Sequence, residues 1–127
     1  MPFVQDAHQK GALNEKKAQL HFMKMGFDVF IPCHGGTRCD FVAIKDEGPK
    51  RVQVKTAQYN GPYIQSRLDV KGKRYTEEDT DLVVFVLDER MWVVPIEEVD
   101  GKSSVCLGKI EDPDYAARVD LSNYEVH

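Results

Sequence analysis

Length, composition and charge restrict the classes of protein to which this chain can belong. The chain has 127 residues, of which 42% are hydrophobic and 30% are charged, so residues 1–127 suit one folded domain rather than a disordered segment. It contains no apolar run of the roughly 20 residues that cross a bilayer and no secretory signal, and its net charge of −4, taken alone, disfavours binding to nucleic acid.

The first third of the chain predicts a helix, a short strand and a loop. Residues 11–25 are rich in helix formers and end at Gly26. Glu15 falls on the otherwise apolar stripe of this helix, where a carboxylate needs a partner or a metal unless it lies at the edge of the stripe and reaches water. Residues 27–31 predict a strand that ends before a proline, and residues 32–39 predict a glycine-containing loop.

The rest of the chain reads mainly as strands. Residues 40–44 and 52–56 predict an antiparallel hairpin, because only a short turn separates them. The polar residues 57–75 predict a loop or an irregular hairpin, and residues 76–79 predict a capped turn of helix. Further strands are expected over 82–87, 91–95 and 105–107. Together these elements predict a single α/β domain with one central sheet.

Four side chains are expected to converge on this sheet. Gln53 and Lys55 are two apart on one strand and therefore share a face. In the predicted hairpin Asp40 lies opposite Lys55 or Thr56, within cross-strand reach. If the helix packs over the same face, Glu15 approaches this group as well.

Two carboxylates and an amide oxygen are hard ligands that suit Mg²⁺. A lysine beside them can orient or deprotonate an attacking water and stabilise charge that develops on a phosphate. A salt bridge between Asp40 and Lys55 without a catalytic role remains open as the alternative interpretation.

The order of these residues resembles the PD-(D/E)XK nuclease superfamily. That resemblance rests on Glu15 in a helix, Asp40 at the start of a strand, and Gln53-Val54-Lys55 in the next strand. The chain is similar, more narrowly, to a branch of small endonucleases that contains group I intron homing enzymes and writes its third motif as Gln-x-Lys. The matching segments, over about residues 11–99, are Gly11–Gly26, Arg38–Val42, Val52–Ala57, Tyr75, Asp81–Val84 and Trp92–Ile96. Archaeal Holliday-junction resolvases have a similar core with a glycine-containing loop before the Asp.

The resemblance implies a restriction-endonuclease-like core, with a central mixed sheet flanked by helices, and a metal-dependent phosphodiesterase. Asp40, Glu15 and Gln53 would be the metal ligands and Lys55 the catalytic lysine. The implied cofactor is Mg²⁺, for which Mn²⁺ substitutes, and no small-molecule cofactor is expected. Cys39 stands where the motif has proline, and Gln53 supplies a neutral oxygen in place of a carboxylate. The neutral oxygen predicts weak metal affinity and leaves an inactive DNA-binding descendant open.

Charge is divided unevenly along the chain. Residues 1–44 carry five basic and four acidic side chains, residues 45–74 eight and three, and residues 75–127 four and fourteen. Affinity for a phosphate backbone depends on local Lys and Arg rather than on global charge. The middle segment is therefore a candidate DNA-binding region, and we expect the acidic C-terminal segment to lie largely away from DNA. The side chains expected to contact DNA are Arg38, Arg67, Lys71, Lys73 and Arg74.

The favoured function is sequence-specific, homing-type cleavage of double-stranded DNA by a homodimer or homotetramer that does not associate with membranes. The alternatives are a Holliday-junction or other structure-selective resolvase, an inactive DNA-binding module of the same fold, and an RNA nuclease. An odd number of cysteines, Cys33, Cys39 and Cys106, predicts reduced thiols and a cytoplasmic protein, in the host's cytoplasm if a phage encodes the chain. A structural zinc site is disfavoured because the cysteines lack a second metal-binding pair.

Overall fold

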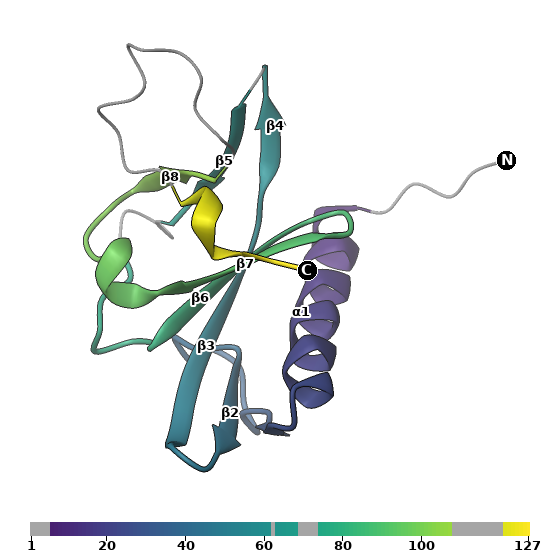
Figure 1. Cartoon of the computed structure of the whole chain (residues 1–127), viewed down its shortest axis with the longest axis vertical. Helices are drawn as coiled ribbons and strands as arrows, with labels where there is room; N and C mark the ends of the chain where they lie inside the picture. Colours follow the sequence, from purple (N-terminus) through teal and green to yellow (C-terminus); the bar gives the residue numbers. More distant parts are fainter. Residues whose placement is uncertain (1–5, 62, 69–73, 108–120) are drawn as a thin grey trace, which may run out of the picture.

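A six-stranded mixed sheet forms the centre of the molecule, with helix α1 against one face (Figure 1). The computed structural model describes residues 6–61, 63–68, 74–107 and 121–127. The strand order is β1-β2-β3-β6-β7-β9, in which β3 and β6 are parallel and the other neighbours are antiparallel. A second, antiparallel sheet has the order β4-β5-β8. The elements are α1 (Ala7–Lys24), β1 (Asp28–Phe30), β2 (Phe41–Lys45), β3 (Gly48–Thr56), β4 (Gln58–Asn60), β5 (Tyr63–Arg67), β6 (Leu82–Leu87), β7 (Arg90–Pro95), η1 (Ile96–Glu98), β8 (Ser104–Cys106), η2 (Ser122–Tyr124) and β9 (Glu125–Val126).

Helix α1 begins earlier than the composition of residues 11–25 predicts. The carboxylate of Asp6 accepts a hydrogen bond from the backbone N–H of Gln9 (2.8 Å), and the Gln9 side chain accepts one from the backbone N–H of Asp6 (3.0 Å). This capping box stabilises the first turn. The helix ends as predicted, at Gly26, whose φ of +91° is a conformation that glycine adopts without strain. Among the described helices, none is long and apolar enough to span a membrane.

The predicted strands are present, with shifted ends. The hairpin of β2 and β3 closes through Asp46 and Glu47, with Lys45 opposite Gly48. The positive φ of Gly48, +98°, permits this tight turn, so β3 starts before the predicted residue 52. The segment predicted as a loop or irregular hairpin contains the hairpin of β4 and β5. The strands over 82–87, 90–95 and 104–106 lie within one residue of the predicted bounds at each end.

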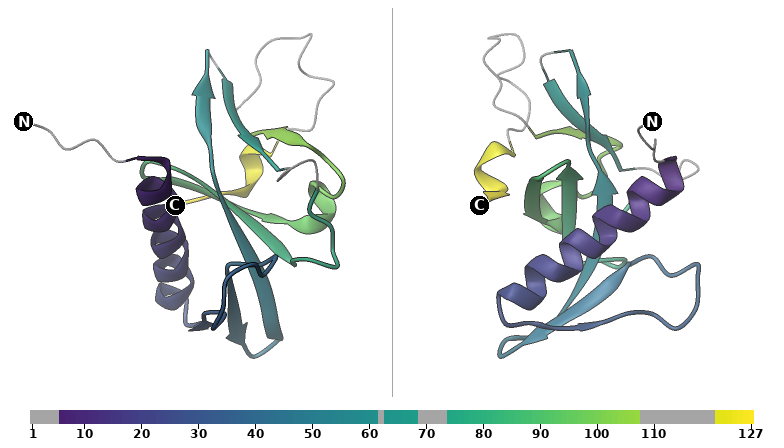
Figure 2. Two further views of the ribbon diagram at one scale, coloured as in Figure 1. Left: turned by 180° about the vertical axis from the view of Figure 1, so that it is seen from behind. Right: turned by 90° about the vertical axis from the view of Figure 1, so that its right-hand side faces the viewer.

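The two faces of the sheet pack against different layers (Figure 2). Val84 and Val86 of β6 lie in a core cluster with Ala18 and Phe22 of α1. Phe85, which alternates with them, belongs to the opposite cluster, together with buried side chains of β5, β8 and η1. The α/β core with a mixed sheet is therefore confirmed, but the second face of the described structure is covered by the small sheet and η1 rather than by another α-helix. The buried side chains of the second cluster are Ala57, Ile64, Leu68, Tyr75, Val83, Phe85, Leu87, Trp92, Val94, Ile96, Val99, Val105, Leu107 and Leu121.

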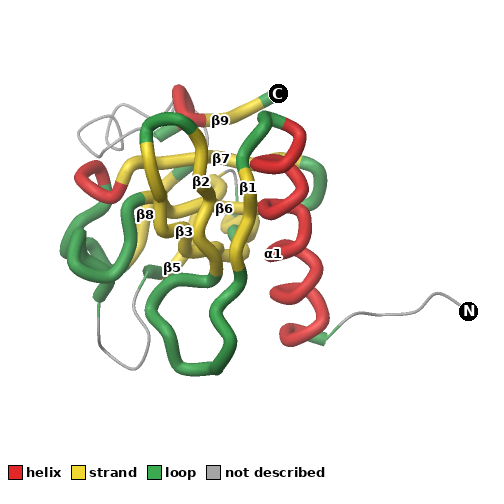
Figure 3. Tube along the Cα trace, turned by 90° about the horizontal axis from the view of Figure 1, so that it is seen from below, coloured by secondary structure: helices red, strands yellow, loops and turns green. Residues whose placement is uncertain are grey.

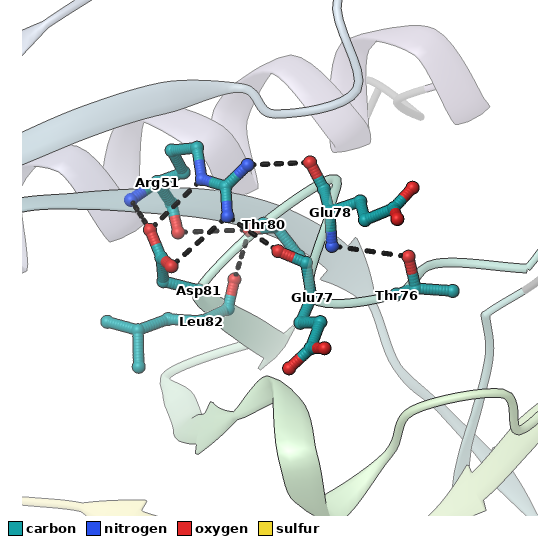
Figure 4. A network of polar contacts seen from close by, with 7 residues as sticks. All are labelled: Arg51, Thr76, Glu77, Glu78, Thr80, Asp81 and Leu82. Carbon is teal, nitrogen blue, oxygen red and sulfur yellow. Dashed lines mark hydrogen bonds and ion pairs between the residues drawn. The ribbon is translucent and has the colours of Figure 1, made fainter.

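A polar network joins β3 to the segment that precedes β6 (Figure 4). The guanidinium of Arg51 donates to the carbonyls of Glu77 and Glu78, both at 2.6 Å, and pairs with both carboxylate oxygens of Asp81. Asp81 also accepts the backbone N–H of Arg51 at 2.7 Å. Hydrogen bonds from Arg51 lower the pKa of the Asp81 carboxyl. The network fixes the connection that brings β6 into parallel register with β3.

Replacing Thr80 with valine is expected to lower the free energy of unfolding by about 1–2 kcal/mol, because valine has nearly the same shape but no donor. Thr80 is fully buried, and its Oγ1 lies 2.9 Å from the carbonyl oxygens of both Arg51 and Leu82. Urea denaturation measures the change. The control is Thr37→Val, which removes a hydroxyl that donates to the Cys39 carbonyl at an exposed position and is expected to change stability by less than about 0.5 kcal/mol. Equal stability of Thr80→Val and the wild type would contradict this role of the hydroxyl.

Candidate active site

Asp40 is held at the start of β2 by the neighbouring strand. Its backbone N–H donates to the carbonyl of Val52 at 2.8 Å, and its carboxylate Oδ2 accepts the backbone N–H of Val54 at 2.7 Å. The side chain thus takes the place of a main-chain acceptor in the ladder between β2 and β3. Because both bonds go to β3, the carboxylate is fixed next to the two residues that alternate with these valines, Gln53 and Lys55.

The register of the hairpin corrects the sequence-based placement of Asp40. Phe41 is opposite Val52, so Asp40, one residue earlier, is opposite Gln53 rather than Lys55 or Thr56. The pairing of the two strands was expected to start at Asp40, but the regular ladder of β2 and β3 starts at Phe41. The side chain of Asp40 extends the ladder by accepting the backbone N–H of Val54. Lys55 lies near enough to Asp40 for its charge to lower the pKa of the Asp40 carboxyl.

Helix α1 packs on the face of β3 that carries Val52, not on the face that carries Gln53 and Lys55. The condition under which Glu15 was expected to approach these residues, a helix over the latter face, is therefore not met. Glu15 is half-buried and lies close enough to Asp40 for the charge of that carboxylate to raise its pKa. Figure 3 shows α1 running alongside β1 at one edge of the view.

Both carboxyl groups are partly removed from water. Burial raises the pKa of Glu15, and the charge of Asp40 raises it further. Burial also raises the pKa of Asp40, against the opposing effects of the Val54 N–H and of Lys55. Two desolvated carboxylates near each other are unfavourable unless a cation compensates them. Lys55 alone compensates these two negative charges only in part. A divalent cation would supply the rest.

The third oxygen of the site comes from an amide. Gln53 is 7% exposed, and its Nε2 donates a long hydrogen bond, 3.5 Å, to the carbonyl of Val54. In the described part of the chain, no group of three or more His, Cys, Asp and Glu side chains is arranged to hold a metal ion. The side-chain oxygen atoms that these residues offer to a metal ion are those of two carboxylates and of the Gln53 amide, and Mg²⁺ accepts such ligands together with water.

The side chains predicted to contact DNA have different environments. Arg67 and Arg74 are exposed, and Nη1 of Arg74 donates to the carbonyl of Gly101 at 2.8 Å. Arg38 is half-buried and is engaged within the protein, where its Nε lies 3.2 Å from a carboxylate oxygen of Asp79. Lys71 and Lys73 lie outside the described residues.

Sequence reasoning missed two polar side chains of α1 that adjoin Glu15. Asn14 is buried, and its Nδ2 donates to Oγ1 of Thr56 in β3 at 2.8 Å. Gln19 is also buried, and its Nε2 has no hydrogen-bond acceptor among the described residues. The signal was present, because Asn14, Ala18 and Phe22 have the spacing of one helix face. The asparagine ties α1 to the end of β3 and thereby sets the position of Glu15.

Comparisons with known proteins agree with this fold. A model of the family described as PD-(D/E)XK endonuclease matches residues 5–123. Protein 5.3 of Escherichia phage T7 is 36% identical over 111 residues, which cover 84% of this chain and 94% of that protein. The structure of the bacterial homing endonuclease I-Ssp6803I superposes with a TM-score of 0.76 at 20% identity, covering 95% of this chain and 89% of that chain, and so shares the fold. The resemblance seen in the sequence is confirmed: the chain belongs to the PD-(D/E)XK endonuclease family.

Proposed function

We propose that this endonuclease is a Mg²⁺-dependent enzyme that hydrolyses phosphodiester bonds of double-stranded DNA at specific sequences, as homing-type endonucleases do. The observation that carries the proposal is the hydrogen bond from Val54 to the carboxylate of Asp40. It fixes the main proposed metal ligand beside Gln53 and Lys55, in a place where burial already disfavours an uncompensated negative charge.

Asp40, Glu15 and Gln53 would hold the metal ion. Their chemistry fits it, because Mg²⁺ and Mn²⁺ prefer oxygen ligands and both carboxyl groups lack full hydration. When bound, such an ion stabilises the charge that develops on the phosphate. In the reaction the oxygen of a water molecule forms a bond to phosphorus while one ester P–O bond breaks, which leaves a phosphate monoester and a hydroxyl. As an ammonium group, Lys55 would orient that water and its charge would stabilise the phosphate oxygens, while one proton of the water ends in net on the leaving hydroxyl.

Replacing Gln53 with glutamate is expected to tighten Mn²⁺ binding by about ten-fold in the absence of DNA, because ligand charge tunes affinity for hard cations. Isothermal titration calorimetry measures the change. The same variant is expected to be less stable without metal, since it adds a third partly desolvated carboxylate next to Asp40. Gln53→Met keeps the volume, loses the oxygen, and should weaken binding. Equal Mn²⁺ affinity for all three proteins would exclude Gln53 as a ligand.

Homing-type specificity is supported by the name of the structural neighbour and by the Gln-x-Lys motif, and cleavage assays test it. The purified protein is incubated with genomic DNA, a synthetic four-way junction and linear duplex, each with Mg²⁺, with Mn²⁺ or with EDTA. We expect cuts at a few mapped sequences in duplex DNA, and none with EDTA. Preferential cleavage of the junction would identify a resolvase, and binding without cleavage would identify an inactive DNA-binding module.

We also propose that the enzyme works as a homodimer or homotetramer, so that two active sites reach two strands. Large apolar side chains are exposed on α1 and around β1 and provide surface for association: Leu20, Met23, Phe30 and Ile31. Light scattering is expected to give two or four times the chain mass of 14.5 kDa. Leu20→Lys should lower that mass, whereas Tyr59→Lys, at an exposed position on β4, should not. A single-chain mass for the wild type at micromolar concentration would contradict the proposal.

A cytoplasmic location is the setting we propose for this activity. None of Cys33, Cys39 and Cys106 forms a disulfide, and reduced thiols persist where glutathione and thioredoxin operate.

A further inference from the structure

The aromatic ring of Tyr75 contacts two cationic side chains, Lys55 and Arg38. The residue lies between β5 and β6, is only 6% exposed, and belongs to the core cluster on the second face of the sheet. Nζ of Lys55 is 4.7 Å from the ring centroid and Cζ of Arg38 is 4.1 Å from it. Both distances are within the range of a cation–π interaction.

The ring is held in place by more than its own burial. Arg38 donates through Nη2 to the carbonyl of Arg74 at 3.0 Å and pairs with Asp79. Asp79 in turn accepts the backbone N–H of Thr76 at 3.0 Å. The residues on both sides of Tyr75 are therefore tied to Arg38, which stands two positions before Asp40 in the chain. Through its contacts with Arg38 and Lys55, the Tyr75 ring joins the loop that leads to Asp40 with β3, the strand that carries Lys55.

We propose that Tyr75 is a positioning residue for Lys55, whose ring face, itself fixed by Arg38, holds the lysine ammonium group next to Asp40. This inference rests on the proposed function only in assigning Lys55 to catalysis. A lysine side chain has four rotatable bonds and loses entropy when it is ordered. The ring face restricts it and partly replaces the water that a half-buried ammonium group loses.

The aromatic face, rather than the hydroxyl, supplies this effect. Burial raises the pKa of Tyr75, so the phenol is neutral at physiological pH and bears no charge toward Lys55. Tyr75→Phe keeps the face and removes the hydroxyl, whereas Tyr75→Leu removes the face and keeps an apolar side chain in the core. The two variants separate positioning from packing.

The test combines single-turnover cleavage at saturating DNA with NMR of the Lys55 ε-methylene protons, assigned through Lys55→Arg. In the wild type these protons should resonate upfield of those of exposed Lys50, because of the ring current of Tyr75. Tyr75→Phe should keep the shift and cleave within about two-fold of the wild type. Tyr75→Leu should lose the shift and cleave about 10–100-fold more slowly, with the DNA concentration at half-maximal rate changed less than about two-fold.

Ile96→Ala is the control for a loss of stability, because Ile96 is buried in the same core cluster but belongs to η1 rather than to the segments that carry Arg38, Lys55 and Tyr75. It should leave the rate and the Lys55 shift unchanged. The proposal is overturned if Tyr75→Leu cleaves like the wild type, or if Lys55 of the wild type shows no upfield shift; the second result needs no variant to fold. If the wild type cleaves no DNA while the shift is present, the catalytic assignment of Lys55 fails and its placement by Tyr75 stands.

Discussion

Replacing Asp40 with asparagine is expected to reduce the rate of DNA cleavage by at least about a thousand-fold, which corresponds to roughly 4 kcal/mol of transition-state stabilisation. The asparagine keeps an oxygen that accepts the N–H of Val54, so the hairpin of β2 and β3 stays in register. It removes the charge that the proposed metal ion requires. Single-turnover cleavage in Mg²⁺ measures the rate.

The same substitution should leave the metal-free protein as stable as the wild type or up to about 1 kcal/mol more stable. Burial raises the pKa of Asp40, so the folded state favours a neutral side chain there, and the amide supplies one. Asp28→Asn, at an exposed position of β1, removes the same charge outside the site and should preserve both rate and stability. A stable Asp40→Asn protein that cleaves at the wild-type rate would show that Asp40 does not bind a catalytic metal.

Replacing Lys55 with methionine is expected to slow cleavage by about 10²–10⁴-fold, the usual contribution of a positioned acid–base group. Methionine retains most of the apolar stem and removes the ammonium group. Mn²⁺ affinity should not fall, because Lys55 is not a proposed ligand and the loss of its positive charge near Asp40 favours a bound cation. Lys50→Met is the matched control, since Lys50 is an exposed lysine of the same strand.

The interpretation of Lys55 as a purely structural partner of Asp40 predicts the opposite pattern. Lys55→Met would then lower stability, would leave the cleavage rate intact, and would be compensated by Asp40→Asn in the double variant. Thermal unfolding and cleavage rates of the two single variants and the double variant distinguish the two interpretations. Loss of cleavage in a folded Lys55→Met protein supports catalysis.

The face of Gln53 and Lys55 was predictable from the sequence because side chains of a strand alternate with period two. The partner of Asp40 was not, since the position where a ladder starts depends on side-chain hydrogen bonds that a local pattern does not encode. Asp40 imitates a main-chain acceptor toward Val54, which shifts its expected partner by two residues or more. Strand ends are the least certain part of any such prediction for the same reason.

The orientation of α1 shows a similar limit. Glu15 was recognised as a carboxylate on an apolar stripe, but Asn14 is the polar side chain at the centre of the buried face. One residue is a rotation of about 100° on a helix, so a helix with three alanines and few large apolar side chains leaves its orientation open. The hydrogen bond between Asn14 and Thr56, which depends on tertiary structure, determines it.

Ion pairs within the fold join the acidic C-terminal segment to basic residues of the earlier segments, which the numbers of charged residues in each segment did not predict. Acidic residues of the C-terminal segment are paired with basic residues from earlier in the chain: Asp79 with Arg38 and Asp81 with Arg51. These pairs use two of the arginines that the sequence made available for phosphate contact. Arg67 and Arg74 are more exposed than Arg38 is.

The most direct test of a metal-dependent active site at Asp40 is single-turnover cleavage of duplex DNA that contains a mapped site, measured as a function of Mg²⁺ concentration. The wild type should show no cleavage in EDTA and a rate that saturates with Mg²⁺. Asp40→Asn should show no metal-dependent rate at any Mg²⁺ concentration, while Asp28→Asn should follow the wild-type curve. Cleavage that persists in EDTA, or an Asp40→Asn protein with the wild-type Mg²⁺ dependence, would contradict the assignment.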